Sequence, residues 1–333
     1  HAAKSASSNL TIEAAGGESY DTLLAAGSAG TIYKSIANRT HLSIANADRA
    51  YSASDTYTPY PDELQLESAA LTEFTISDTA RVEVRDTQSV YAHVMTLSDT
   101  CNLYGDEMVL NVQDLTLSGA VDVDTSLTVR TLDGEAGAEA TSETRRQMTV
   151  GPAAVLTVST IDAKLDDSNF TLMDGGEIDA SSTPIMLECV GMPCAVDISG
   201  SVDCSSSACA ASVTALNGSI DVSGLLSCTE DSCSISTSAR YIDVAGGITC
   251  SGDDCVIDSV AKKLGTYHTM HATGDDSIIR VNVTSGSMIL SDTVEASTIE
   301  LCASGDLVVA AGTHIDADGR GEASQSGTGA GAG

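Results

Sequence analysis

The sequence predicts an all-β fold, a right-handed parallel β-helix in which short strands stack as successive coils of a solenoid. Three observations predict it. Apolar and polar residues alternate along most of the chain, four Cys-x4-Cys units recur, and an Asp-containing strand motif keeps a constant distance from the cysteines. Each is taken below in turn.

The first observation is the alternation. Short segments in which every second residue is apolar are typical of strands that bury one side, and here Asp, Gly, Ser and Thr separate them. Examples are residues 82–84, 121–123, 127–129 and 279–283. Helical periodicity is nearly absent, and residues 139–148, rich in Glu, Ala, Thr and Arg, are the best candidate for a helix or an insertion.

The second observation is the set of Cys-x4-Cys units. They are Cys189/Cys194, Cys204/Cys209, Cys228/Cys233 and Cys250/Cys255. Structural zinc sites usually combine Cys-x2-Cys pairs with further Cys or His, whereas these units have a spacing of four and no His nearby. We therefore expect a local disulfide within each unit, which fixes a turn.

The third observation is the Asp motif. Asp197, Asp221 and Asp243 each lie in an apolar-Asp-apolar segment, and each precedes the first Cys of a unit by seven residues. The units recur at 24 and 22 residues. A period near 20 built of short strands and polar turns is typical of a solenoid, where each coil packs only on its neighbours. The aspartates are then expected to form a ladder along the rod.

Two cysteines remain outside the units, Cys101 and Cys302. They are 201 residues apart, which in a solenoid places them many coils from each other. Pairing within one chain is therefore not expected. They are either buried free thiols or cross-links between neighbouring subunits.

Cysteine usage and sequons both indicate an extracellular location. Disulfides persist in oxidising compartments, and Asn-x-Ser/Thr sequons mark glycan acceptors in secreted chains. Five of the eight asparagines lie in such sequons: Asn9, Asn38, Asn169, Asn217 and Asn282. We expect N-linked glycans there and no cofactor, with Ca2+ left as a possible bound ion.

Charge excludes one class of partner. Lys and Arg total 15 against 47 Asp and Glu, a formal net charge of -32, so nothing is available to neutralise the phosphates of nucleic acid. Association between copies would need specific contacts or a counter-ion, for which Ca2+ is the natural candidate; a solvated acidic surface is the alternative. No stretch approaches the roughly 20 apolar residues of a membrane span.

The residues do not predict an enzyme. Hydrolysis of a polysaccharide needs carboxylates that converge on one place, but the repeated aspartates recur once per coil. Lys is scarce and Trp is absent. His268 and His271 lack the acidic motif of a metalloprotease, and the pattern from Asp316 to Glu322 is an incomplete calcium loop.

Three regions are expected. Residues 1–63 form an N-terminal β segment with a Pro- and Tyr-rich arm, residues 64–320 form the β-helix, and residues 321–333 form a Gly-rich tail. Tyr51, Tyr57 and Tyr60 of the arm either cover an end of the core or dock on a neighbouring copy, and the prolines exclude a central strand there.

The Ile-Asp-Val-Ser-Gly and Cys-x4-Cys units, with residues 315–321 leading into the Gly-rich end, resemble large pectin-lyase-like β-helix surface proteins of protists and algae. The resemblance covers residues 100–333. It implies a cell-surface, adhesive or filament-forming protein, with flagellar hairs (mastigonemes) as one setting, and no catalytic residue of the family has a matching position.

The function expected from the sequence is that of a structural glycoprotein subunit of an extracellular filament or cell-surface appendage. Copies would assemble with each other, or with other filament subunits, through the solenoid ends and the arm. A polysaccharide-binding or polysaccharide-cleaving β-helix is the alternative, and an adhesin segment is a third possibility.

Overall fold

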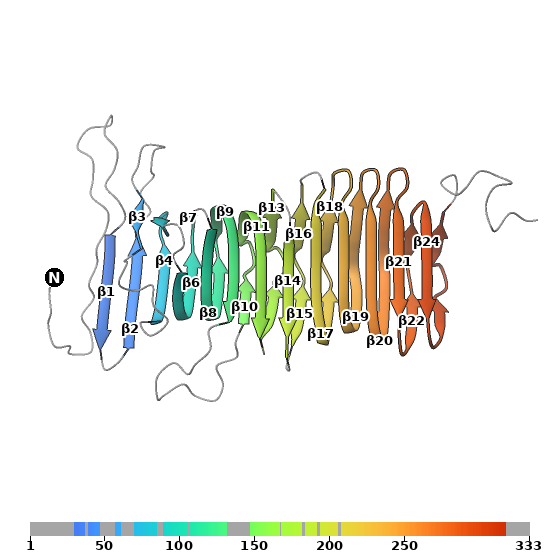
Figure 1. Cartoon of the computed structure of the whole chain (residues 1–333), viewed down its shortest axis with the longest axis horizontal. Coiled ribbons are helices and arrows are strands. Elements are labelled where there is room, and N and C mark those ends of the chain that lie inside the picture. The colour runs from blue at the N-terminus through green and yellow to red at the C-terminus, as the bar shows by residue number, and fades with distance from the viewer. Residues whose placement is uncertain are drawn as a thin grey trace, which may run out of the picture.

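The computed structural model describes residues 30–36, 39–46, 57–60, 70–84, 89–105, 107–131, 147–166, 168–181, 184–191, 194–205 and 208–317. In this part of the chain every regular element is a strand, and the strands stack side by side along one long axis (Figure 1). Nearly all pairings are parallel, so the predicted all-β parallel β-helix is confirmed. No helix in the described residues has the length and hydropathy needed to cross a bilayer.

Each coil has three strands, which lie on three faces. One coil consists of β14 (Ile185–Val190) on face 1, β15 (Ala195–Ile198) on face 2 and β16 (Ser201–Cys204) on face 3. The chain then enters face 1 of the next coil with β17 (Ala210–Val222), which pairs with both β14 and β15. We name the turns between faces the 1–2, 2–3 and 3–1 corners.

The remaining strands follow the same order. Face 1 also holds β21 (Ile278–Val283) and β24 (Thr298–Ala303). Face 2 also holds β2 (Arg39–Ala45), β4 (Leu71–Ser77), β10 (Gln147–Val150), β12 (Asn169–Leu172), β22 (Ser287–Leu290) and β25 (Leu307–Val309). Face 3 also holds β3 (Thr58–Pro59), β5 (Arg81–Glu83), β7 (Cys101–Tyr104), β13 (Glu177–Ala180), β18 (Leu225–Cys228), β23 (Thr293–Glu295) and β26 (His314–Asp316).

Several strands continue through a corner. Like β17, two strands run from face 1 to face 2: β6 (Ser89–Ser98) and β8 (Glu107–Ser118). Two run from face 3 to face 1: β9 (Ala120–Thr131) and β11 (Val155–Asp166). Two pass through all three faces: β19 (Ser234–Ser251) and β20 (Val256–Thr273).

The core lies inside the solenoid and is built from the alternation seen in the sequence. Val196, Ile220 and Ile242 are register partners on three successive coils, and all three are buried. Each inward side chain therefore packs on the same position of the coils before and after it. A narrow interior of this kind is filled by Val, Ile, Leu and Ala, which explains why so few aromatic residues are needed.

Tyr267 is one of four buried aromatic residues in the described core, with Tyr60, Phe74 and Phe170. The Tyr267 ring lies over Gly265, where an added Cβ would approach the ring carbon Cε2 to 2.6 Å, so the glycine provides the space. The Tyr267 and Ser259 hydroxyls lie 2.7 Å apart, and the Thr237 hydroxyl donates a 2.8 Å hydrogen bond to Ser259. Burial raises the pKa of Tyr267 to about 12, with the Ser259 contact acting in the opposite direction.

The N-terminal end is closed differently from the rest. β1 (Gly30–Ile36) pairs antiparallel with β2, while β2 pairs parallel with β4. Stacking on face 2 thus begins before residue 64, the boundary that the sequence suggested. β3, which contains Pro59, pairs with β5 at the end of face 3, where the missing N–H of proline is tolerated.

The tyrosines of the predicted arm take part in this end. Tyr60 is buried, with its ring 5.6 Å from that of Phe74. Tyr57 stacks on Tyr104 with ring centroids 4.8 Å apart. Tyr57 and Tyr60 therefore cover the core, which is one of the two roles considered for them; Tyr51 lies outside the described residues.

The predicted helix or insertion at residues 139–148 is corrected at its end. Gln147 and Met148 begin β10, which pairs with β8 and β12. Met148 is buried in the core, so the repeat takes precedence there over the helix-forming composition. Residues 139–146 lie outside the described residues.

Candidate functional site at the open end of the solenoid

The last described coil leaves apolar core positions exposed. Leu307, Val309 and Ile315 continue the inward-facing columns of the solenoid, yet their exposed fractions are 48%, 48% and 43%. Their register partners on the preceding coil are 0% exposed: Met288, Leu290 and Val294. The difference arises because no described residue packs on the outer side of this coil.

The backbone is open at the same place. Within the described residues, β24, β25 and β26 pair only with β21, β22 and β23 of the coil before. Parallel strands with one unpaired edge are templates for further strands, and natural proteins usually cover or charge such edges. Apolar surface and unpaired backbone thus coincide in one end surface, which we call the open coil.

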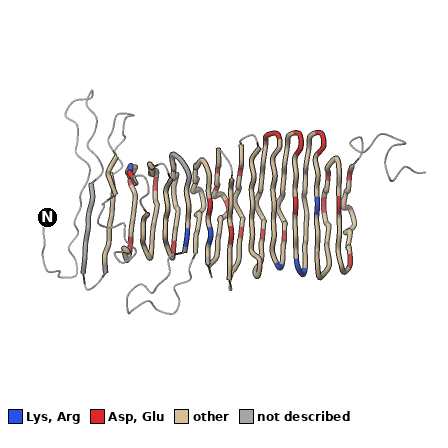
Figure 2. Tube along the Cα trace, viewed as in Figure 1, with Lys and Arg blue, Asp and Glu red and all other residues tan. Residues whose placement is uncertain are grey.

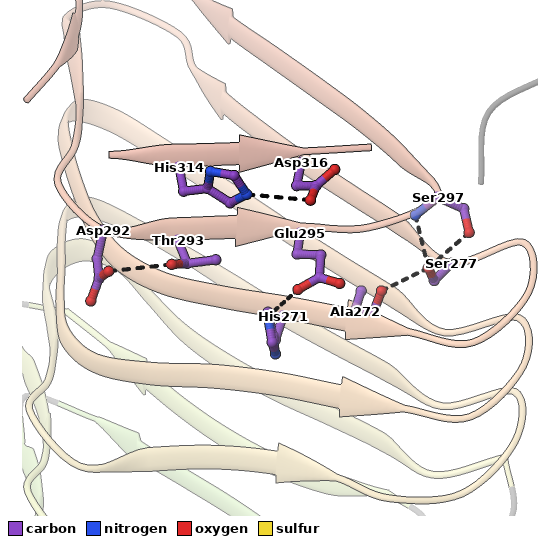
Figure 3. A network of polar contacts seen from close by, with 9 residues as sticks. All are labelled: His271, Ala272, Ser277, Asp292, Thr293, Glu295, Ser297, His314 and Asp316. Atoms are coloured by element: carbon purple, nitrogen blue, oxygen red, sulfur yellow. Dashed lines mark hydrogen bonds and ion pairs between the residues drawn. The ribbon is translucent and has the colours of Figure 1, made fainter. Parts of the chain in front are cut away.

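Polar contacts hold the turns beside the open coil (Figure 3). The Ser277 hydroxyl donates to the carbonyl of Ala272 at 2.8 Å and accepts the N–H of Ser297 at 3.0 Å. On the outside of face 3, His271 Nε2 lies 2.6 Å from a Glu295 carboxylate oxygen. These polar side chains therefore have partners. Of the exposed apolar side chains of β25 and β26, Leu307, Val309 and Ile315 occupy inward positions, and Val308 lies on the outward side.

The two ends of the solenoid differ from each other. Among the described strands, the outermost strand of face 2 at the C-terminal end is β25, which runs parallel to its neighbour. At the N-terminal end it is β1, which runs antiparallel. The two end surfaces of the described solenoid are therefore unlike.

The cysteine units occupy two corners. Disulfides join Cys204 to Cys209 and Cys250 to Cys255 at the 3–1 corner. The Cys189–Cys194 disulfide instead lies at the 1–2 corner, between β14 and β15. It lacks the seven-residue spacing from Asp, which was the signal in the sequence that set it apart.

The fourth unit lies between two bonded ones. Cys204, Cys228 and Cys250 are register partners, so the three 3–1 corner units stack in one column. Cys228 and Cys233 are both buried and in hydrogen-bond contact, with no covalent bond between them in the structure. Burial, followed by the contact with Cys233, raises the pKa of the Cys228 thiol.

The two cysteines outside the units have opposite environments. Cys101 lies in the core with an exposed fraction of 0%, and burial together with the Asp99 charge raises its pKa to about 12. Cys302 is exposed on the outer side of β24 in the open coil. Each of the two alternatives considered from the sequence therefore fits one of these cysteines. Cys101 is a buried thiol, whereas Cys302 is exposed and could react with another molecule.

The aspartates of the repeat form the expected ladder. Asp197, Asp221 and Asp243 are register partners on the outside of face 2, and all three are exposed. Partial burial, and then the charges of Asp197 and Asp243, raise the pKa of Asp221. These carboxylates repeat once per coil along an exposed face. They do not form the pair of carboxylates converging on one place that polysaccharide hydrolysis needs.

A second acidic column lies at the 3–1 corner. Successive turns carry exposed acidic side chains, and Figure 2 shows three neighbouring turns coloured red at this edge. They are Glu230, Asp231, Asp253, Asp254, Asp275 and Asp276. The N–H of Asp253 donates to an Asp231 carboxylate oxygen at 3.0 Å, and Asp275 repeats the contact with Asp253. The 22-residue spacing of these acidic turns was visible in the sequence but was not part of the prediction.

The remaining predicted ligand residues do not come together as a metal site. Among the described residues, one group of three places its ligand atoms within 4.8 Å of one another: Cys204, Cys209 and Cys228. Two of these sulfurs form a disulfide and are not available as thiolates. Of the calcium-like pattern, Asp316 pairs with His314 at 3.3 Å, and Asp318 to Glu322 lie outside the described residues.

Three of the five sequon asparagines are described. Asn217 and Asn282 are exposed, and Asn169 is half-buried with its Oδ1 accepting the N–H of Ala195 at 3.1 Å. Asn9 and Asn38 lie outside the described residues.

Comparison with known proteins gives no relative. No family model, curated protein or solved structure matches the chain. The function is therefore argued from the surfaces described above.

Proposed function

We propose that the chain is a structural subunit of an extracellular filament or coat, in which copies join end to end through the open coil. The observation that carries the proposal is the exposure of Leu307, Val309 and Ile315 at positions that are fully buried one coil earlier. Burying this surface against another copy would continue the core and supply partners for the strand edges.

The unlike ends favour a chain of copies over a closed pair. A contact between two different surfaces of the same molecule repeats indefinitely unless a rotation closes it into a ring. In the proposed contact, β25 of one copy meets the outer edge of β1 in the next, so face 2 continues from one subunit to another.

The extracellular setting is supported by the local disulfides. Three bonded pairs within a short stretch are typical of an oxidising compartment. The proposal gives the protein no catalytic role, because the repeated carboxylates serve as a periodic surface in both acidic columns. Ca2+ as a counter-ion between rods remains part of the proposal, in view of the net charge of -32.

Negative-stain electron microscopy of the full chain, produced through the secretory pathway of a eukaryotic host, tests this function. We expect rods longer than one solenoid, with an axial repeat set by the length of a subunit. A monodisperse monomer that binds or cleaves an acidic polysaccharide would overturn the proposal in favour of a carbohydrate-active β-helix.

A further inference from the structure

The three described sequons lie at the same corner of the solenoid. Asn169 is the first residue of β12 on face 2, and Asn217 lies in β17 where that strand passes from face 1 to face 2. Asn282 is next to the last residue of β21 on face 1. All three therefore belong to the 1–2 corner, although 113 residues separate the first from the last.

Their positions along the axis follow from the register. Asn169 pairs with Ala195, which pairs with Ser219, so Asn169 and Asn217 are two coils apart. Asn282 stands three coils beyond Thr214, which precedes Asn217 in the same coil. At about 4.8 Å per coil, the separations along the edge are about 10 Å and about 14 Å.

The side chains can carry glycans in the folded protein. Asn217 and Asn282 are exposed. The hydrogen bond of Asn169 uses Oδ1, whereas the bond to a sugar is made by Nδ2. The other two corners of the described solenoid carry no sequon, and the 3–1 corner carries the acidic column and two of the three disulfides.

We propose that Asn169, Asn217 and Asn282 carry N-linked glycans that form one continuous sugar-bearing edge, and that this edge faces outward in the assembled filament. At each site the amide Nδ2 loses a proton and bonds to C1 of the first sugar, as the lipid-linked pyrophosphate of the oligosaccharide donor leaves. The inference rests on the extracellular setting of the proposed function. It adds that side-by-side contacts between rods use the two sugar-free corners.

Cys302 provides a built-in probe of the edge. Asn282 and Cys302 are register partners on adjacent coils, and both are exposed on the outer side of face 1. A glycan on Asn282 would stand over the thiol. The Asn217 glycan would lie on the same edge but three coils away from Asn282, on the side away from Cys302, so it should not cover this thiol.

The test uses the full chain secreted from a eukaryotic host. Glycopeptide mass spectrometry should find sugar on all three asparagines. A polymer-coupled maleimide should label Cys302 several-fold more slowly in the wild type than in the Asn282→Gln variant, while Asn217→Gln keeps the slow rate. In assembled material, peptide-N-glycosidase should release the glycans and leave Asp at each site.

Two results would overturn the inference. One is unmodified Asn217 and Asn282 in the secreted chain, and the other is glycans that become resistant to the glycosidase only on assembly. Both can occur in a protein that still polymerises. Conversely, a fully glycosylated protein that never polymerises contradicts the proposed function but leaves the sugar-bearing edge in place, so the two failures are distinguishable.

Discussion

The hydroxyls of Ser259 and Tyr267 meet at 2.7 Å inside the solenoid, where both side chains are completely buried. Ser259 also accepts the hydrogen bond of Thr237, its register partner on the coil before. A chain of three hydroxyl groups therefore links two coils inside a mainly apolar core.

Ser259→Ala should leave the buried Tyr267 hydroxyl without this contact and lower the free energy of unfolding by about 1–3 kcal/mol. Denaturant unfolding measures the change. Adding Tyr267→Phe in the same background removes the orphaned hydroxyl and should cause little further loss. Equal stability of wild type and Ser259→Ala would contradict the role given to this contact.

Cys228 and Cys233 should form the fourth disulfide in the secreted protein, because they stack between two bonded pairs of the same spacing. Alkylation after unfolding, followed by peptide mapping, should then find two thiols, on Cys101 and Cys302. Replacing both Cys228 and Cys233 by Ala should lower stability by about 2 kcal/mol, the value expected for a loop of this length. Finding four alkylated cysteines would show that the pair stays reduced.

The same substitution should affect the stability of the protein at Cys101 but not at Cys302. Cys101→Ser places a hydroxyl in the core and should lower the free energy of unfolding by about 1–3 kcal/mol. Cys302→Ser lies on the surface and should leave it unchanged within about 0.5 kcal/mol. In the native protein only Cys302 should react with a thiol reagent. Rapid labelling of Cys101 would place it outside the core.

Asp221→Asn should stabilise the protein at neutral pH by a few tenths of a kcal/mol, the low end of the range for like charges on adjacent strands, because the site is exposed and screened. The raised pKa of Asp221 means that the folded chain holds this proton more tightly than the unfolded chain. The stability linked to it is thus present below the unfolded pKa of about 3.9 and is lost as pH rises through the folded value. The gain from the substitution should vanish near pH 3 and shrink in high salt. A gain that is independent of both pH and salt would have another cause.

Much of the fold could be predicted because short sequence motifs recur once in each coil. The apolar-Asp-apolar motif and the Cys spacing determine which residues share a column, and the register pairs Asp197 with Asp221 and Asp221 with Asp243. The Cys189/Cys194 unit shares the Cys-x4-Cys spacing but lacks the Asp seven residues earlier, and it spans another corner. Its place depends on which face β14 occupies, and that is set by stacking across coils.

The candidate site could not be predicted in the same way. Residues 307–311 are apolar without alternation, so the sequence does not show that Leu307 and Val309 face inward, and it gives no sign that this coil is open. The single-corner placement of the sequons is likewise hidden, because whether Asn169 and Asn282 lie at the same corner depends on the summed lengths of the coils between them. Tyr267 entered the core because of Gly265, a pairing that a two-residue alternation does not reveal.

The most direct test of assembly through the open coil is sedimentation velocity over a range of concentrations, with two matched variants. Val309→Lys places a charge on the inward column, whereas Val308→Lys places the same charge on the outward side of the same strand, at a residue that is 46% exposed. We predict that the wild type and Val308→Lys form species larger than one chain as concentration rises, while Val309→Lys remains a monomer. If the wild type sediments as a monomer at every concentration, or if the two variants behave alike, the open coil is not the joint between subunits.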